Sequence, residues 1–296
     1  MRTVVSVNGR ITSPEDAVVP ALDRGFLYGD SVYEVLWWHR GCPIQAEDHL
    51  LRLVESGRRV YLDLPGPKTR WIAAMEEAVA AAGTGPDDDA YVRLIVTRGA
   101  GPIGLPFGPG LLPTVVVIVA PAHRPTNEEH RRGLAVALVD RLRVSVKALD
   151  PGAKTGNYMN NLLALHEAHQ CGADDAVLLN DRGEVTEGTT SNVYVVRRGE
   201  LATPSIDAGI LRGTTRTRIL DLCAKNTIPA VERTLAPRDL VEADEVFLSS
   251  SVRGVIPVTK IDGRPVGTGM PGPVTERVHA LFEAAADRDA ALARAR

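Results

Sequence analysis

Three features of this chain carry residue types that can do chemistry together: a lysine, an acid and a helix start. Lys154 lies in PGAKTGNYMNN, just before a predicted helix. Glu187 lies at the centre of EVTEGTTSN, and a glycine and two threonines at 213–215 open another predicted helix. A lysine amine can condense with an aldehyde, a carboxylate can keep a ring nitrogen protonated, and helix N–H groups can bind a phosphate. Together these groups suit the cofactor pyridoxal 5′-phosphate (PLP).

Each of these residues also has an ordinary structural interpretation. A loop lysine, a loop glutamate and a Gly-Thr-Thr helix start are common in globular proteins. The same holds for Arg52 in EDHLLRL, which would normally be a solvated helix arginine. The order, spacing and local sequence of the whole set favour the cofactor site, whereas no single member does.

The first part of the chain mixes strands and helices. An opening hairpin turns at Asn8–Gly9, and VYEVLWW follows as a buried strand. Leucine spacing predicts a helix from Glu47 to Tyr61, and an alanine-rich helix ends near Gly83. YVRLIVTRG and TVVVIVA are β-branched and predict two more strands.

The second part of the chain contains the chemically suggestive residues. An amphipathic helix is predicted from Tyr158 to Gln170, with Leu162, Leu165 and Ala168 on one face. Short strands around AVLLN, EVTE, NVYVV and ELAT are joined by tight turns. Further helices are predicted for residues 214–225 and from about residue 272 to the end.

Length and one charged, proline-containing stretch predict the domain organisation. At 296 residues the chain exceeds one typical domain. PAHRPTNEEHRRG, residues 121–133, is the best linker candidate because of its prolines and charges. We therefore expect a small N-terminal domain over 1–120 and a larger C-terminal PLP-binding domain over 134–296.

Composition argues against several functional classes. The net charge is −3, and no basic patch with interleaved aromatic residues suggests a nucleic-acid partner. The three cysteines, Cys42, Cys171 and Cys223, lack the paired spacing of a metal site. No apolar run is long enough to span a bilayer. We expect a soluble cytoplasmic protein with neither a metal nor a membrane partner.

Four longer motifs resemble the class IV aminotransferases, the PLP enzymes of fold type IV. They are DRGFLYGDSVYEV, KTGNYMNNLLALHEA, EVTEGTTSNVYVV and ADEVFLSSSVRGVIPV, and the resemblance covers nearly the whole chain. It implies two α/β domains, of which the larger has a β-barrel-like core. It also implies a cofactor between the domains and a homodimer or higher homo-oligomer, in which a neighbouring subunit helps to close the site.

The resemblance implies a role for each motif residue. Lys154 would be the Schiff-base lysine and proton carrier, and Glu187 would pair with the pyridine nitrogen. Tyr158 would bond the 3-oxygen of the cofactor. The phosphate would be bound by a further set: Arg52, Gly213, Thr214, Thr215 and Ser251. Leu211 would pack on the ring, while Asn192, Thr189 and Thr190 would line the site or brace Glu187.

The substrate-binding residues are less decisively indicated. The triplet Tyr33-Glu34-Val35 resembles D-amino acid transaminases, in which the tyrosine hydroxyl can reach a substrate carboxylate. The arginine and histidine that such enzymes carry after TRG are replaced here by Ile103 and Leu105. The remaining candidates for substrate contact are Trp37, Arg93, Val252 and Arg253.

Among these, two arginines could replace the missing carboxylate anchor. A guanidinium binds a carboxylate with two parallel hydrogen bonds. Arg253, in SSSVRGV, is our first candidate for the substrate α-carboxylate, and Arg93 is the second. Because Trp37 and Trp38 alternate on one strand, only one of them should face the site.

The sequence therefore predicts a transaminase that works between an α-amino acid and a 2-oxo acid by a ping-pong route. D-amino acids are the favoured substrates, with (R)-amines as further candidates. The alternative is a branched-chain L-amino acid aminotransferase. A third reading, aminodeoxychorismate lyase, would use the same cofactor groups but release pyruvate without an amino acceptor.

Overall fold

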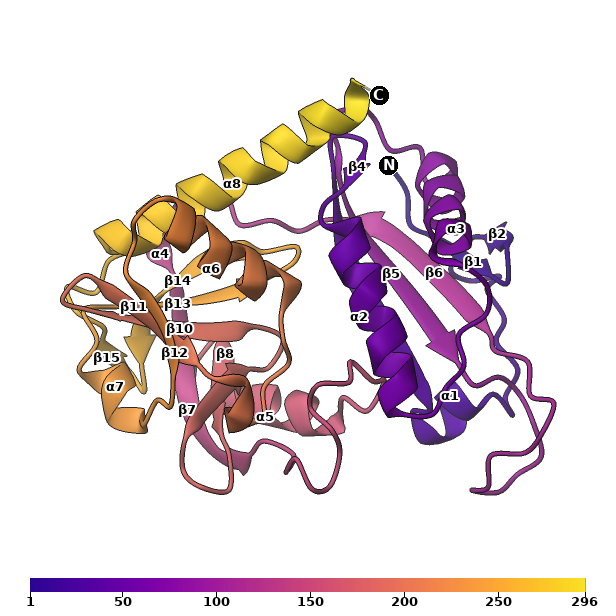
Figure 1. Cartoon of the computed structure of the whole chain (residues 1–296), viewed down its shortest axis with the longest axis horizontal. Helices are drawn as coiled ribbons and strands as arrows, with labels where there is room; N and C mark the ends of the chain where they lie inside the picture. Colours follow the sequence, from indigo (N-terminus) through magenta and orange to yellow (C-terminus); the bar gives the residue numbers. More distant parts are fainter. Residues whose placement is uncertain (296) are drawn as a thin grey trace. The chain divides into compact units, whose positions relative to one another are not determined.

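The computed structural model describes residues 1–295, which form two compact units (Figure 1). Unit 1 comprises Met1–His123, Ala153–Asn157 and residues 286–295. Unit 2 comprises Arg124–Gly152 and Tyr158–Ala285. Each unit has its own sheet and its own hydrophobic core.

Unit 1 is built on a six-stranded sheet with the order β2-β1-β6-β5-β3-β4. Every neighbouring pair is antiparallel. The strands are β1 (Val4–Val7), β2 (Arg10–Thr12), β3 (Ser31–His39), β4 (Cys42–Pro43), β5 (Asp89–Thr97) and β6 (Val115–Pro121). The helices are α1 (Arg24–Tyr28), α2 (Ala46–Arg59) and α3 (Lys68–Ala81).

The alternation of side chains along β3 separates two kinds of residue. Val32, Leu36 and Trp38 point to the face that α2 and α3 cover, where they join the core. Glu34 shares this face. Tyr33 points to the opposite face, as does Arg93 on the neighbouring strand β5. One strand therefore supplies both a buried acid and a tyrosine on the other side of the sheet.

Unit 2 contains a closed barrel. Strands β10, β13, β14, β7, β8 and β9 pair in this order, and pairing of Asn192 with Glu187 joins β9 back to β10. Their bounds are β7 (Leu134–Leu142), β8 (Asp175–Leu179), β9 (Val185–Gly188), β10 (Asn192–Arg197), β13 (Glu245–Ser250) and β14 (Gly254–Ile261). The expected mixed α/β fold with a barrel-like core is confirmed.

The remaining elements of unit 2 extend or cover this barrel (Figure 1). Strands β11 (Glu200–Pro204), β12 (Ala230–Arg233) and β15 (Arg264–Pro265) extend the sheet. The helices are α4 (Asn127–Arg132), α5 (Met159–Gln170), η1 (Ile206–Ala208), α6 (Thr214–Lys225), α7 (Pro237–Val241) and the first part of α8 (Pro273–Arg294), whose residues from 286 on belong to unit 1. Among the described residues, no helix is long and apolar enough to cross a membrane.

Helix α5 does not bury the leucines of its predicted apolar face. Of Leu162, Leu165 and Ala168, which we placed on one face, only Ala168 is buried, together with Asn161 and Ala164. Ala164 and Ala168 pack with residues of β7 and β8 in one small cluster. Small side chains allow the helix to approach the barrel closely, whereas Leu162 stays exposed.

Two segments that we assigned to the C-terminal domain group with unit 1. Thr155 pairs with Val32, and the Tyr33 N–H donates to the Lys154 carbonyl (3.0 Å). At the end of α8, Asp287 accepts a hydrogen bond from Arg40 (2.8 Å). Both segments are attached by long-range contacts, which sequence periodicity does not report. The stretch predicted as a linker, 121–133, contains the short helix α4.

Candidate functional site

In unit 1, a buried acid holds two basic residues of α2. Arg52 Nε donates to Glu34 Oε1 and Arg52 Nη2 to Glu34 Oε2, both at 2.7 Å. His49 Nδ1 lies 2.6 Å from Glu34 Oε2. Burial by itself raises the pKa of Glu34, but Arg52 and His49 outweigh it and lower this pKa to about 2. Glu34 is therefore ionised, and it orients the arginine that we expected at the phosphate.

Burial has the opposite consequence for His49. It lowers the pKa of His49, and the nearby positive charges of Arg52 and Lys154 act in the same direction, while Glu34 opposes them. Desolvation disfavours the charged form of an imidazole. The cluster therefore favours a neutral His49 beside an ionised Glu34.

Lys154 lies on a short extended segment at the edge of unit 1. Its backbone N–H donates to Ser56 Oγ (3.0 Å) on α2, and its carbonyl accepts from the Tyr33 N–H. Its Nζ lies 4.6 Å from the centre of the Tyr33 ring. The lysine backbone is thus fixed by hydrogen bonds from both α2 and β3, as a reactive amine requires.

Arg93 lies over the same Tyr33 ring. Its guanidinium carbon is 4.1 Å from the ring centre, which is a cation–π distance. Its Nε is buried and has no hydrogen-bond partner among the described residues. Unit 1 therefore brings together three predicted site residues: Tyr33, Arg93 and Lys154. Trp37 is fully buried and donates to Asp89 (3.0 Å), while Trp38 lies in the core.

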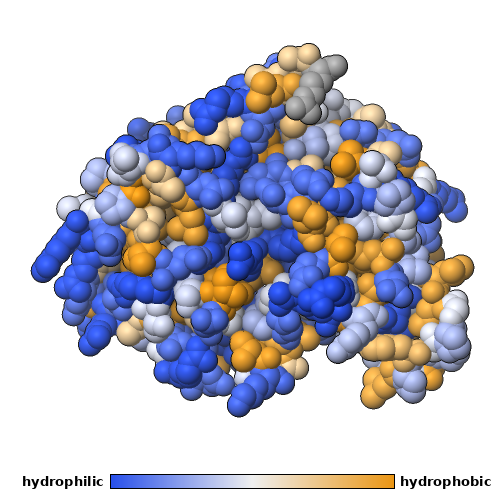
Figure 2. Space-filling view, in the orientation of Figure 1, coloured by the Kyte–Doolittle hydropathy of each residue, from blue (hydrophilic) through white to orange (hydrophobic). Residues whose placement is uncertain are grey.

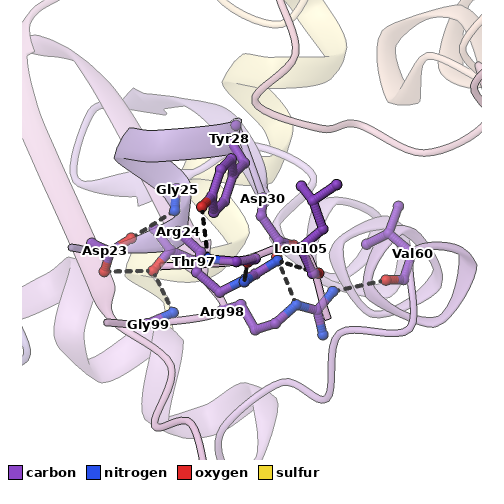
Figure 3. A network of polar contacts seen from close by, with 12 residues as sticks. Asp23, Arg24, Gly25, Tyr28, Asp30, Val60, Thr97, Arg98, Gly99 and Leu105 are labelled. Carbon is purple, nitrogen blue, oxygen red and sulfur yellow. Dashed lines mark hydrogen bonds and ion pairs between the residues drawn. The ribbon is translucent and has the colours of Figure 1, made fainter. Parts of the chain in front are cut away.

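A charged network fixes the loop that follows β5 (Figure 3). Arg24 donates to the carbonyls of Gly104 (2.8 Å) and Leu105 (3.1 Å). Arg24 and Arg98 both donate to Asp30, at 2.9 and 2.8 Å. These bonds hold the loop backbone while the side chains of Ile103 and Leu105 stay 79% and 76% exposed.

In unit 2, Glu187 is positioned by the barrel. It is the third residue of β9 and is only 6% exposed. Its Oε2 accepts from the Leu211 N–H (3.1 Å), and Arg143 Nη2 lies 2.8 Å from Oε1. Glu187 therefore lies between a backbone amide and a guanidinium, and its carboxylate oxygens can accept a hydrogen bond from a further donor such as a ring nitrogen.

The strand that follows this acid connects it to the start of α6. Asn192 Nδ2 donates to the Leu211 carbonyl (3.1 Å). Gly213 is the N-cap of α6, and a Cβ there would lie 2.1 Å from Asn192 Oδ1. Any larger residue at this position would have to displace the Asn192 amide. Leu211 and Asn192 therefore contact Glu187, and Gly213 adjoins Asn192.

The first turn of α6 offers groups suited to an anion. Thr214 and Thr215 are both buried, and the Thr215 hydroxyl has no hydrogen-bond partner among residues 1–295. The first backbone N–H groups of a helix also lack partners within the helix. A buried, unsatisfied hydroxyl at a helix N-terminus fits a phosphate ligand.

Four further predicted residues lie elsewhere in unit 2. Tyr158 is the N-cap residue of α5. Ser251, Val252 and Arg253 form the half-buried turn between β13 and β14. Arg253 donates to the buried Asp175 (3.2 Å) and to Thr190 Oγ1 (3.3 Å). The positive charge of our first anchor candidate therefore already has a carboxylate partner.

Three residues of these clusters were missed from the sequence. Arg143 and Asp175 carry no local motif, and only long-range pairing brings them to Glu187 and Arg253. Glu34 was visible within the YEV triplet. Glu34 lies on the inward face of β3, where the other residues are apolar. An acid in that position could have indicated a basic partner on the helix that covers the face.

Comparison with known proteins gives one consistent family. The model of the family described as amino-transferase class IV matches residues 31–261. A D-alanine aminotransferase from Listeria monocytogenes is 37% identical over 94% of each chain. A Methanocaldococcus jannaschii protein, provisionally named branched-chain-amino-acid aminotransferase, is 34% identical over 94% of this chain and 95% of its own.

Solved structures agree with this family. The branched-chain aminotransferase of Thermoproteus uzoniensis with norvaline has a TM-score of 0.87 at 30% identity, covering 95% of this chain and 93% of its own. The branched-chain amino acid aminotransferase of Thermobaculum terrenum in its PLP form has a TM-score of 0.85 at 26% identity, covering 96% of this chain and 93% of its own. The chain belongs to the class IV aminotransferases and is a PLP-dependent enzyme that acts on amino acids and 2-oxo acids.

Proposed function

We propose that this aminotransferase transfers the amino group of a D-amino acid to a 2-oxo acid in two half-reactions. The observation that supports this most is the Tyr33-Glu34-Val35 triplet on β3, with Tyr33 beside Arg93 and Lys154. Relatives named D-alanine aminotransferase, 37% identical, also favour it. (R)-amines are further candidate substrates, because they share the configuration without a carboxylate.

Lys154 and Glu187 have complementary roles in this proposal. When bound, PLP supplies an aldehyde for the substrate amine and a ring that accepts the electron pair left when the Cα proton departs. Lys154 is the covalent attachment residue and then moves that proton as a general base and acid. Glu187 would hold the proton on the pyridine nitrogen, and the ion pair with Arg143 (2.8 Å) orients the Glu187 carboxylate. Tyr158 would donate a hydrogen bond to the 3-oxygen of the cofactor, and Leu211 would pack on the cofactor ring.

The phosphate is assigned to the helix N-terminus and its neighbours. The N–H groups at the start of α6 and the Thr215 hydroxyl would donate to the phosphate oxygens. Thr214, Ser251 and Arg52 complete the proposed set. Glu34 fixes the orientation of Arg52 through two hydrogen bonds, so its guanidinium does not have to be ordered when the phosphate binds.

Arg93 is the better candidate for the substrate carboxylate. Its buried Nε has no partner within the described part of the chain, and its guanidinium lies over Tyr33. Arg253, by contrast, is bonded to Asp175. We therefore propose that Arg93 and the Tyr33 hydroxyl bind the carboxylate. Arg93→Ala should raise KM for D-alanine more than it lowers kcat, and Arg93→Lys should restore part of the loss; an unchanged KM would reject the assignment.

Half-reactions test the substrate class directly. The PLP-loaded enzyme is mixed with D-alanine, L-leucine or (R)-phenylethylamine, and the absorption band of the bound cofactor is followed. The proposal predicts fast loss of the band with D-alanine and slow loss with L-leucine. The reverse order would establish the alternative, a branched-chain L-amino acid aminotransferase, which the Methanocaldococcus jannaschii relative favours. Pyruvate released from aminodeoxychorismate without an amino acceptor would instead identify the lyase.

The exposed loop of unit 1 supports self-association. Ile103 and Leu105 project from a backbone that Arg24 holds, and Figure 2 shows apolar side chains gathered at the lower right of the molecule. A second copy of the chain is the occupant that the family resemblance implies. Light scattering should therefore give a dimer or larger oligomer, and Ile103→Asp with Leu105→Asp should dissociate it. Val241→Asp, at an exposed position of unit 2, is the control. A monomeric wild-type protein would contradict the proposal.

A further inference from the structure

We propose that Asp175 and Arg253 position the turn that follows Glu187, and that Arg253 acts through this turn rather than on the substrate. The residues concerned, Asp175, Thr189, Thr190 and Arg253, are called the Asp175 cluster below. The inference rests on the proposed function, because it concerns the residue assigned to the pyridine nitrogen. The cluster lies entirely in unit 2.

Asp175 connects two turns through its two carboxylate oxygens. Oδ1 accepts from the Thr189 hydroxyl (2.5 Å) and from the Thr189 N–H (3.3 Å). Oδ2 accepts from Arg253 Nη2 (3.2 Å), which also donates to Thr190 Oγ1 (3.3 Å). The two turns are residues 189–191, between β9 and β10, and residues 251–253, between β13 and β14.

The first of these turns determines where Glu187 lies. The Gly188 N–H donates to the Ser191 carbonyl (2.7 Å), and Asn192 pairs with Glu187 across the turn. Asn161 on α5 also donates to the Thr189 carbonyl (2.7 Å). The backbone on the C-terminal side of Glu187 is therefore fixed by side-chain donors and acceptors. A change at Thr189 would be transmitted to Glu187 through two peptide units.

The burial of Asp175 explains why the cluster needs an arginine. Asp175 is only 2% exposed, and a buried carboxylate is costly unless hydrogen bonds and a cation compensate it. Arg253 supplies that cation. If Arg253 turned to bind a substrate carboxylate, it would leave Asp175 as an uncompensated buried charge. The geometry therefore favours a positioning role.

The second turn gives the cluster a further consequence. It includes Ser251, which we assign to the phosphate, next to Arg253. Asp175 thus links the turn that follows Glu187, the residue assigned to the pyridine nitrogen, to the turn that contains Ser251, which is assigned to the phosphate. Loosening this link should weaken binding of the cofactor itself, before any substrate is present.

PLP binding by the apoenzyme provides the test. The variants are Asp175→Asn, Arg253→Ala, Arg253→Lys and the double variant Asp175→Asn/Arg253→Ala. Arg233→Ala removes a comparable ion pair of unit 2, with Asp239 (3.0 Å), and is the matched control. Dissociation constants for PLP are measured by absorbance titration, and amide hydrogen exchange is measured over 188–191 without cofactor.

The positioning role predicts a specific pattern. Arg253→Ala and Asp175→Asn should each weaken PLP binding by roughly tenfold, and the double variant should be no worse than either single one, because the two residues act as a pair. Arg253→Ala and Asp175→Asn should each speed amide hydrogen exchange over 188–191. Arg253→Lys keeps the ion pair and should restore part of the affinity for PLP. Arg233→Ala should change neither quantity.

A role as substrate anchor predicts the opposite. Arg253→Ala would then raise KM for the amino acid and leave PLP affinity and exchange unchanged, and Asp175→Asn would free the arginine and lower KM. This result would overturn the inference. It is distinct from failure of the proposed function, in which the wild-type protein would bind PLP but convert no D-amino acid. If Asp175→Asn does not fold, the two Arg253 variants still decide the question.

Discussion

The surroundings of Lys154 in unit 1 and of Glu187 in unit 2 are organised by different interactions. Beside Lys154, a buried acid, Glu34, holds Arg52 and His49 by charged hydrogen bonds. Glu187 accepts a hydrogen bond from the Leu211 N–H, and a tight backbone turn follows it. Unit 1 relies on one buried charge cluster, whereas unit 2 combines backbone contacts with an ion pair from Arg143 to Glu187 (2.8 Å).

This difference suits the roles that we propose for the two regions. The lysine proposed to carry the cofactor lies near charges that Glu34 fixes, and the groups proposed for the ring and the phosphate are spaced by the barrel and the start of α6. Substitutions should therefore act differently in the two units: loss of a charge should lower stability most in unit 1, whereas in unit 2 loss of a charge should act on catalysis and an added atom on the spacing around Asn192.

The largest expected effect on stability is in unit 1. Glu34→Gln leaves Arg52 and His49 buried without their anion, which should lower the free energy of unfolding by about 3–5 kcal/mol. Urea denaturation of unit 1, followed by the fluorescence of its tryptophans, measures the change. Glu55→Gln, which breaks the exposed pairs with Arg58 and Arg59 on the same helix, should leave the midpoint nearly unchanged. If the two variants lowered the free energy of unfolding equally, the buried Glu34 cluster would be no more important for stability than the exposed ion pairs of Glu55.

The largest expected effect on catalysis from unit 2 is at its acid. Glu187→Gln keeps the shape but loses the charge that holds the pyridine proton, so kcat should fall by roughly two orders of magnitude or more. Steady-state transamination measures it. Glu184→Gln, in the turn just before β9, removes a carboxylate that pairs with Arg182 and should leave kcat unchanged. An active Glu187→Gln enzyme would show that the pyridine nitrogen has another partner.

The stabilisation that Glu34 gives to unit 1 should depend on pH in the acid range. The pKa of Glu34 is lowered from 4.5 to about 2, so the native state binds fewer protons than the unfolded state in this interval. Its stabilisation is complete above the unfolded pKa and is lost as pH falls towards 2. The wild-type protein should therefore lose its advantage over Glu34→Gln between these values. A difference that is independent of pH would contradict the assignment of charge to Glu34.

A smaller effect is expected from one added methyl group in unit 2. Gly213→Ala displaces Asn192 and breaks its hydrogen bond to Leu211, a loss of about 1 kcal/mol. PLP affinity should weaken accordingly, with little change in the charge-dependent behaviour of unit 1. Gly108→Ala is the control, because an added Cβ there has no neighbour within 4 Å. Unchanged PLP affinity in Gly213→Ala would mean that the spacing around Asn192 tolerates the methyl group.

The sequence predicted the elements better than their contacts. The helix expected over 214–225 is α6 with the same bounds, because glycine and threonine mark its start locally. Closure of the barrel by β9 and β10 was only implied by family resemblance, since strand pairing is a long-range property. The buried face of α5 was predicted wrongly because leucine spacing outweighed the close packing of Ala164 and Ala168.

The same limit applies to the candidate site. Lys154, Glu187 and Gly213 carry local motifs, so they could be proposed from the sequence. Arg143 and Asp175 could not, because an ion pair between residues far apart in the sequence leaves no periodic signal. Arg253 illustrates the consequence: it is a plausible anchor as an isolated arginine, but its bond to the buried Asp175 changes that interpretation.

The central claim, that Lys154 is the residue to which PLP attaches, can be tested by one mapping experiment. The PLP-loaded enzyme is reduced with borohydride, digested and analysed by peptide mass spectrometry. We expect a phosphopyridoxyl group on Lys154 alone and its absence in Lys154→Ala. A label on Lys147, the preceding lysine in the sequence, or PLP bound without any reducible link to a lysine, would contradict this assignment.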